Sequence, residues 1–257
     1  MDSSRTPTGT DADPSRRRRP SRKLLLVGVA ALVLAVAAGG IYGAWSILVG
    51  SASPAAVTIG PPAIPSGANV PAPASLDGTW QVSDSLGSFG DFSSSWAGYQ
   101  VKEQFAGIGG HTAVGRTPKV TGSMTLAGGS VSDVQITADL TALVSDDARR
   151  DGELGGLGIE TNKFSTAVFK TIQPIVLTLP AEGQIASVTA TGALSLHGVT
   201  KTVQIALQAR RQGGIVAVSG SVNIVFADYG FQGPTSLLVV SVEDHGIMEL
   251  HLLFTHA

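Results

Sequence analysis

Apolar and polar residues alternate with a period of two along most of the chain after residue 77. Between residues 134 and 142, for example, every second residue is Val, Ile, Ala or Leu, and the residues between them are polar. Successive side chains of a β-strand point to opposite faces of the sheet, so this alternation predicts strands with one apolar and one solvated face, as antiparallel sheets have. The other alternating stretches are residues 120–126, 188–196, 203–210, 216–226 and 248–254.

Shorter strand candidates raise the expected number of strands to about eight to ten. These candidates lie at residues 79–84, 95–105, 164–172 and 174–180, and only residues 147–157 resemble a short helix. The pairs Gly128-Gly129 and Gly213-Gly214 predict hairpin turns. Many half-buried antiparallel strands form either a sandwich or a closed barrel. A barrel of about eight strands has room for its own side chains or for one ligand, and the pattern alone leaves both possibilities open.

The N-terminal part contains an uncharged apolar stretch at residues 24–49. A helix of about 20 apolar residues crosses a bilayer, so this stretch predicts a single-pass transmembrane helix that acts as a signal anchor. The basic run of residues 16–23 precedes it, which predicts a cytoplasmic N-terminus and an extracytoplasmic C-terminal domain at the cell membrane. A cleaved signal peptide is the alternative, because Ala35-Val36-Ala37 has the small-x-small form of a cleavage site.

The sequence therefore divides into a basic, disordered arm (1–23), the transmembrane helix (24–49), a linker rich in Pro, Ala and Ser (50–76) and a β-domain (77–257). After residue 23 the chain has ten Lys and Arg against sixteen Asp and Glu. Such a domain lacks the basic face that nucleic acid binding requires. The chain has no Cys, which excludes disulfides, thiolate metal sites and thiol catalysis.

Three motifs in the β-domain occur in a recognisable order. They are Leu194–Val203 (LSLHGVTKTV), Arg150-Asp151 and Leu154 followed by Thr161–Phe169 (TNKFSTAVF), and Asp228–Phe231 (DYGF). Together they resemble the signature of the YceI-like family over roughly residues 78–257. The resemblance implies an all-β fold, an extended, lipocalin-like antiparallel barrel of about eight strands with one short helical excursion. It also implies binding of a lipid or polyisoprenoid inside that barrel.

A tunnel through such a barrel would shield a long apolar chain from water, which is worth about 0.8 kcal/mol for each CH₂ group. The partner expected from the resemblance is a membrane lipid, namely an isoprenoid lipid or a quinone. Arg150 and Asp151 are candidates for contacts with its headgroup or for the tunnel entrance. The candidate lining residues, chosen as inward positions by strand parity, are Tyr99, Val101, Phe105, Met124, Ile136, Leu140, Phe169, Leu194, Ile205, Val222, Ile224 and Phe226.

The sequence departs from the family pattern at three positions. Ser165 replaces a usual proline, Glu153 stands where many members have His, and Gly155 stands where many have Arg. If that His or Arg holds a headgroup in the family, the headgroup preference of this chain differs. The apolar alternation, and with it the barrel, is unaffected.

No pattern typical of an enzyme stands out. The chain lacks a G-x-S-x-G elbow and a G-x-G-x-x-G loop, and His251 and His256 face opposite sides of one strand and so predict no metal site. The charged cluster of residues 146–151 is typical of a solvated turn with internal ion pairs. We therefore expect a non-enzymatic protein that stores, transports or senses a long-chain isoprenoid or similar lipid at the outer face of the cytoplasmic membrane. The alternative is an extracytoplasmic structural or protein-interaction domain with a filled core.

Overall fold

The computed structural model describes residues 61–107, 109–177, 181–234 and 239–257. The predicted basic arm and transmembrane helix, residues 1–49, lie outside this range, and so does part of the predicted linker. Within the described residues, none of the helices combines the length and hydropathy that a membrane span requires.

The described residues form a β-structure with one short α-helix. The long strands are β1 (Gly78–Val82), β2 (Trp96–Phe105), β3 (Gly109–Thr117), β4 (Val120–Ala127), β5 (Ser130–Asp139), β7 (Thr166–Thr171), β9 (Ile185–Leu196), β10 (Val199–Gln212), β11 (Ile215–Val225) and β13 (His245–His256). The short strands are β6 (Val144–Ser145), β8 (Ile175–Val176) and β12 (Val239–Val242). The helices are α2 (Ala148–Glu153) and the 3-10 turns η1 (Phe89–Asp91), η2 (Leu140–Ala142) and η3 (Phe226–Tyr229).

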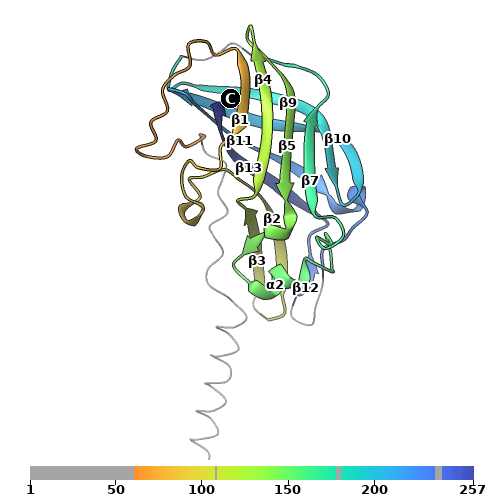
Figure 1. Cartoon of the computed structure of the whole chain (residues 1–257). Helices are drawn as coiled ribbons and strands as arrows, with labels where there is room; N and C mark the ends of the chain where they lie inside the picture. The colour runs from red at the N-terminus through yellow and green to blue at the C-terminus, as the bar shows by residue number, and fades with distance from the viewer. Residues whose placement is uncertain (1–60, 108, 178–180, 235–238) are drawn as a thin grey trace, which may run out of the picture. The chain divides into compact units, whose positions relative to one another are not determined.

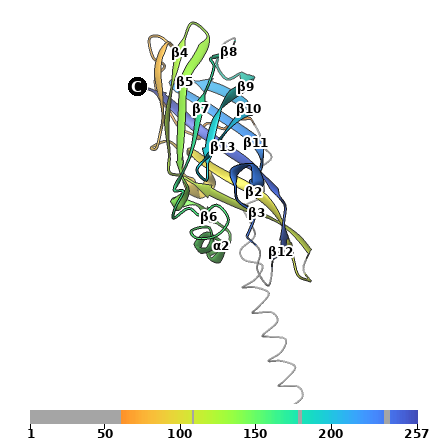
Figure 2. The same ribbon diagram turned by 90° about the vertical axis from the view of Figure 1, so that its right-hand side faces the viewer.

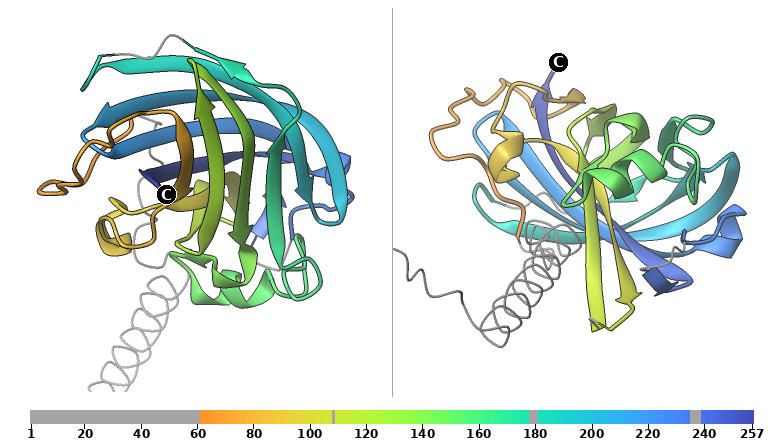
Figure 3. Two further views of the ribbon diagram at one scale, coloured as in Figure 1. Left: turned by 45° about the horizontal axis from the view of Figure 1, so that its top comes forward. Right: turned by 90° about the horizontal axis from the view of Figure 1, so that it is seen from below.

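Eight antiparallel strands close into a ring, in the order β1-β4-β5-β7-β9-β10-β11-β13 and back to β1 (Figure 1). Strand β1 closes the ring, because its residues Trp80 and Gln81 both pair with β4 on one side and with β13 on the other. Figure 3 shows the long strands curving around the interior. The prediction of a closed antiparallel barrel of about eight strands is therefore confirmed.

Strands β2 and β3 extend the sheet beyond the ring. The last residues of β13 pair with β1, whereas Ile247–His251 of the same strand pair with β2. Strand β3, paired with β2, was absent from the predicted strands. The reason is that both of its faces are covered: Ala113 and Val114 are neighbours in sequence and are both buried, so no alternation marks the strand.

Turns and ends follow local sequence signals. Gly128-Gly129 and Gly213-Gly214 lie between β4 and β5 and between β10 and β11, as predicted. The predicted strand over residues 134–142 was wrong at its end, because the carboxylate of Asp139 accepts a hydrogen bond from the backbone N–H of Thr141 and begins η2 there. The helical excursion predicted over 147–157 is the shorter α2, which the side chain of Asp147 caps.

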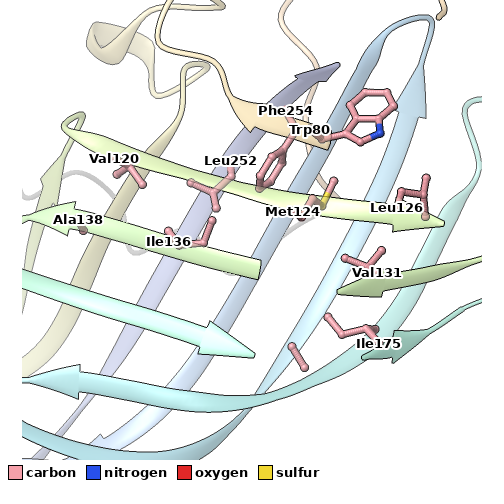
Figure 4. Packing of buried hydrophobic residues seen from close by; sticks show 11 residues of the cluster. Trp80, Val120, Met124, Leu126, Val131, Ile136, Ala138, Ile175, Leu252 and Phe254 are labelled. Atoms are coloured by element: carbon pink, nitrogen blue, oxygen red, sulfur yellow. The ribbon is translucent and has the colours of Figure 1, made fainter. Parts of the chain in front are cut away.

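Buried apolar residues form two clusters on the inner face of the ring. The upper cluster lies toward the β4–β5 turn in Figure 1 and includes Trp80, Met124 and Phe254, which Figure 4 shows at close range. The lower cluster includes Leu140 and Ile224 and packs against Leu143 and Ile159. Figure 2 shows α2 at the opposite end of the strands from the β4–β5 turn. Phe169 of β7 packs against both clusters.

The outer face is covered in two places. The first cover is part of the predicted spacer: Ile64 and Val70 pack against Leu253, and the Val70 carbonyl accepts a hydrogen bond from the Gly214 N–H at 2.8 Å. Pro62 is almost completely buried. The segment that composition predicts as a spacer therefore contains residues that pack on the barrel.

The second cover consists of the rings of Phe92 and Trp96, which lie over a buried ion pair on the outer face. Arg116 of β3 binds Glu249 of β13 at 2.9 Å, and their side chains are 1% and 0% exposed. The guanidinium carbon lies 4.4 Å from the ring centroids of both Phe92 and Trp96, so two aromatic rings enclose the cation. Gln100 donates a further hydrogen bond to Glu249 at 2.6 Å.

Candidate functional site

Two cavities lie inside the barrel, one beside each buried cluster. The lower cavity encloses about 880 Å³ between its lining atoms, with its mouth included, and the upper cavity encloses about 1060 Å³. Within these volumes the centres of water molecules could occupy about 120 Å³ and 130 Å³.

The described lining of the upper cavity is apolar except for Arg210 and Arg211. Side chains from most strands of the ring contribute to it, among them Met124, Leu207 and Val218. An apolar cavity of this kind cannot orient a polar group in its interior, but it removes hydrocarbon from water.

The lower cavity is also mainly apolar, but polar side chains reach it from one side. Glu103 and Arg150 lie in its lining together with Tyr99 and Gln232. Apolar residues from the loops close the rest, including Leu154 and Phe231. A ligand that spans both cavities would meet hydrogen-bonding groups in the lower one.

Most of the residues predicted to line a tunnel do line one of these cavities. The predicted residues in the lower cavity are Tyr99, Val101, Leu140, Ile224 and Phe226. Those in the upper cavity are Met124, Ile136, Phe169 and Ile205. Leu194 and Val222 belong to the lower cluster but contact neither cavity.

Phe105 lines neither cavity. Strand β2 continues past its last pairing with β13, at Gln100, so Phe105 lies at the outer end of the β2–β3 hairpin. Its ring contacts His111 there. Strand parity gives the face of a residue, but it does not show where the ring of the barrel ends.

Sequence reasoning missed the cavity residues that come from loops. Leu143, Leu154, Ile159 and Phe231 line the lower cavity but lie in segments without a regular period. The signal that could have found two of them is the family resemblance, since Leu154 and Phe231 belong to its motifs.

The two predicted headgroup residues have different roles. Arg150 faces the lower cavity and binds Glu103 at 3.0 Å and Asp146 at 2.6 Å. Partial burial lowers the pKa of Arg150, but the carboxylate of Glu103 and then that of Asp146 outweigh it and raise the pKa on balance. Asp151 instead accepts hydrogen bonds from the Ser145 N–H, which holds the loop before α2.

The charged cluster at α2 is only partly the solvated turn that its composition suggests. Asp146 and Arg150 are 3% and 12% exposed, whereas the Arg149–Asp147 pair is open to solvent. Among the described residues, no three His, Asp or Glu side chains are arranged to hold a metal ion.

The three sequence motifs meet around His197, at the turn between β9 and β10. Its Nδ1 lies 3.0 Å from the carbonyl oxygen of Tyr229 and its Nε2 lies 2.8 Å from a carboxylate oxygen of Glu160. The rings of Phe164 and Phe231 contact its imidazole, and Phe231 also lines the lower cavity. Residues that are far apart in sequence therefore build one wall of this cavity.

A family model for the YceI-like domain matches residues 83–254. The chain belongs to this family. The matched region begins just after β1 and contains the whole lining of the lower cavity and the motifs around His197, so the resemblance of those motifs to the YceI-like signature is confirmed. No curated protein sequence matches the YceI-like chain.

Solved structures are similar to this YceI-like chain. A polyisoprenoid binding domain from Saccharophagus degradans, implicated in plant cell wall breakdown, superposes with a TM-score of 0.50 at 19% identity, covering 63% of this chain and 98% of that domain. BcnA of Burkholderia cenocepacia gives a TM-score of 0.45 at 16% identity, with coverage of 61% and 95%. The YCEI protein of Campylobacter jejuni gives 0.44 at 14% identity, with coverage of 56% and 84%.

Proposed function

We propose that this YceI-like domain binds a long apolar lipid, such as an isoprenoid chain, inside its barrel without catalysing a reaction on it. The positive-inside pattern of residues 16–49 further supports a location at the outer face of the cytoplasmic membrane, where such a lipid is stored, carried or sensed. The similarity of the fold to a polyisoprenoid binding domain agrees with this class of ligand.

The observation that carries the proposal is the pair of apolar cavities along one continuous inner face. Unfilled space in a protein core costs about 24 cal/mol for each Å³, so cavities with 120 and 130 Å³ open to water centres would each cost about 3 kcal/mol. Water gives little in return, because a buried water needs polar partners that the upper cavity offers only at Arg210 and Arg211. An apolar occupant removes this cost.

The test is to purify the full-length chain from membranes in a mild detergent and to analyse its organic extract by mass spectrometry. We expect an apolar lipid at a ratio near one per protein. A protein that carries no lipid, and that binds none when lipid is added, would support the alternative of an interaction domain with a filled core.

A matched pair of variants assigns the lipid to the barrel interior. Ile224 lines the lower cavity, whereas its neighbour Val225 is 46% exposed on the outer face. Ile224→Asp places a carboxylate without a partner in the cavity and should abolish lipid retention, while Val225→Asp should retain it. Circular dichroism establishes that each variant is folded, and equal lipid content in two folded variants would contradict an interior site.

A further inference from the structure

Three exposed apolar residues lie on the segment that joins β7 to β9. They are Ile172, Val176 and Ile185, which are 57%, 82% and 44% exposed, and we call them the rim residues. Strand β8 in this segment pairs with β5 beside the β4–β5 turn, so the segment borders the upper end of the barrel (Figure 2). Ile175 and Leu177 of the same segment line the upper cavity. The segment therefore forms part of the cavity wall and also presents apolar side chains to the outside, as membrane or protein contact sites do.

The chain joins the barrel near the same end. Residues 64–70 pack on the outer face of β11 and β13, and the Val70 carbonyl accepts a hydrogen bond from Gly214 in the β10–β11 turn. Leu76 then lines the upper cavity. Residues 50–60, which follow the predicted membrane helix, can span at most about 36–40 Å. A barrel with its lower end on the membrane would use most of that reach to pass β11, which is roughly 33 Å long for its 11 residues. The tether thus favours the upper end as the end that faces the membrane.

The charges of the upper end suit an anionic phospholipid surface. Arg210 of β10 pairs across the sheet with the first residue of β9, and it forms no ion pair with a carboxylate of the described residues. The carboxylate of Glu182 lies 3.9 Å from Arg211, and those of Asp77 and Asp133 accept local hydrogen bonds. An unpaired cation beside apolar side chains is the combination with which proteins bind the interface of anionic bilayers.

The lower end also has exposed apolar residues, but carboxylates surround them. Val240 of β12 is 59% exposed. The side chains of Glu243 and Asp244, which follow β12, are 39% and 89% exposed, and that of Asp228 in η3 is 60% exposed. An anionic surface repels these groups, so charge and tether length favour the same end.

Resting on the proposed location at the outer face of the cytoplasmic membrane, we propose that the rim residues form a membrane-docking surface. Ile172, Val176 and Ile185 enter the interface of the bilayer, and Arg210 contacts a lipid phosphate. The partner is a bilayer that contains anionic phospholipid. Docking holds the upper end of the barrel on the membrane whatever the barrel contains.

The experiment uses the full-length chain in vesicles of phosphatidylcholine and phosphatidylglycerol that include a phospholipid with a nitroxide on its acyl chain near the headgroup. The chain has no Cys, so one introduced Cys carries an NBD fluorophore at a single defined position. The reporter positions are Val176→Cys at the upper end and Val240→Cys at the lower end as the matched control. Quenching of NBD by the nitroxide measures contact with the bilayer, and flotation of the vesicles measures membrane association separately.

We expect strong quenching of the label at residue 176 and little at residue 240. With the label at Ile185→Cys, Val176→Asp should remove most of the quenching, because a carboxylate is disfavoured in the bilayer interface, whereas Val240→Asp should not. Replacing phosphatidylglycerol by phosphatidylcholine should weaken quenching. Arg210→Gln should abolish this dependence on lipid charge, whereas Lys201→Gln at the other end of β10 should preserve it. Circular dichroism establishes that each variant is folded.

Three results would overturn the docking surface: quenching at residue 240 as strong as at residue 176, unchanged quenching of the label at residue 185 in a folded Val176→Asp variant, or an unchanged dependence on lipid charge in Arg210→Gln. Each leaves the proposed membrane location intact if the protein still floats with the vesicles. A full-length protein that does not float with them overturns the location itself, and the docking surface with it.

Discussion

Filling the lower cavity from the protein side is a direct test of whether it is usable space. Ala167 of β7 lines the lower cavity and is 5% exposed. Ala217 of β11 is 0% exposed, but it lies on the outer face, packed with Ile215 and Leu253 under residues 64–70. Ala167→Leu and Ala217→Leu are therefore the same chemical change at two buried strand positions, one beside a cavity and one in close packing.

The expected effects have opposite signs. Three added carbons need roughly the space of three waters, and the lower cavity has about 120 Å³ open to water centres beside Ala167. Their burial contributes about 2.4 kcal/mol, and ordering the leucine side chain costs about 0.5–1 kcal/mol. Ala167→Leu should thus stabilise the lipid-free protein by about 1–2 kcal/mol. Ala217→Leu has no such space and should destabilise the protein by about 1–3 kcal/mol.

Urea unfolding of both full-length variants, delipidated and measured under identical detergent conditions, gives the two free energies. The second measurement is lipid content, which Ala167→Leu should lower because the new side chain competes with the ligand for the same volume. Equal destabilisation of the two variants would refute the reasoning, since it would mean that the space beside Ala167 collapses or is already filled.

Two further predictions concern the outer face. Glu249→Leu leaves the buried Arg116 cation unpaired and should lower the free energy of unfolding in urea by about 3–5 kcal/mol. Glu243→Leu, in the exposed pair with Lys102, should lower it by less than about 1 kcal/mol. Equal losses would show that the buried pair contributes no more than a surface pair. Burial lowers the pKa of His251 to about 4, so between pH 6.5 and pH 4 the unfolded chain binds a proton that the folded chain does not. The free energy of unfolding should therefore decrease by up to about 3 kcal/mol as the pH is lowered from 6.5 to 4. His251→Asn should reduce this loss, whereas His245→Asn, at a half-exposed site, should not. An unchanged pH profile in His251→Asn would contradict the assignment.

Much of the barrel could be predicted because its signal is local. A strand needs only its own alternation to define two faces, so the inward positions of Ile136, Ile205 and Ile224 followed from parity. Glycine pairs gave the hairpin turns for the same reason, since their freedom at positive φ is a property of the residue itself. Three motifs in the order typical of the YceI-like family indicated membership of that family, and the family model matches residues 83–254.

The tertiary structure decided which parts of each face are covered, and by what. Glu249 and His251 belong to the polar alternation of the last strand, yet the segment with Phe92 and Trp96 buries them on the outer face. Likewise, the ring of Tyr99 packs over Gly115 of strand β3, a strand that the alternation did not reveal. The physical reason is that alternation records which side chains share a face, whereas burial, charge pairing and cavity volume depend on segments that meet that face from distant parts of the chain.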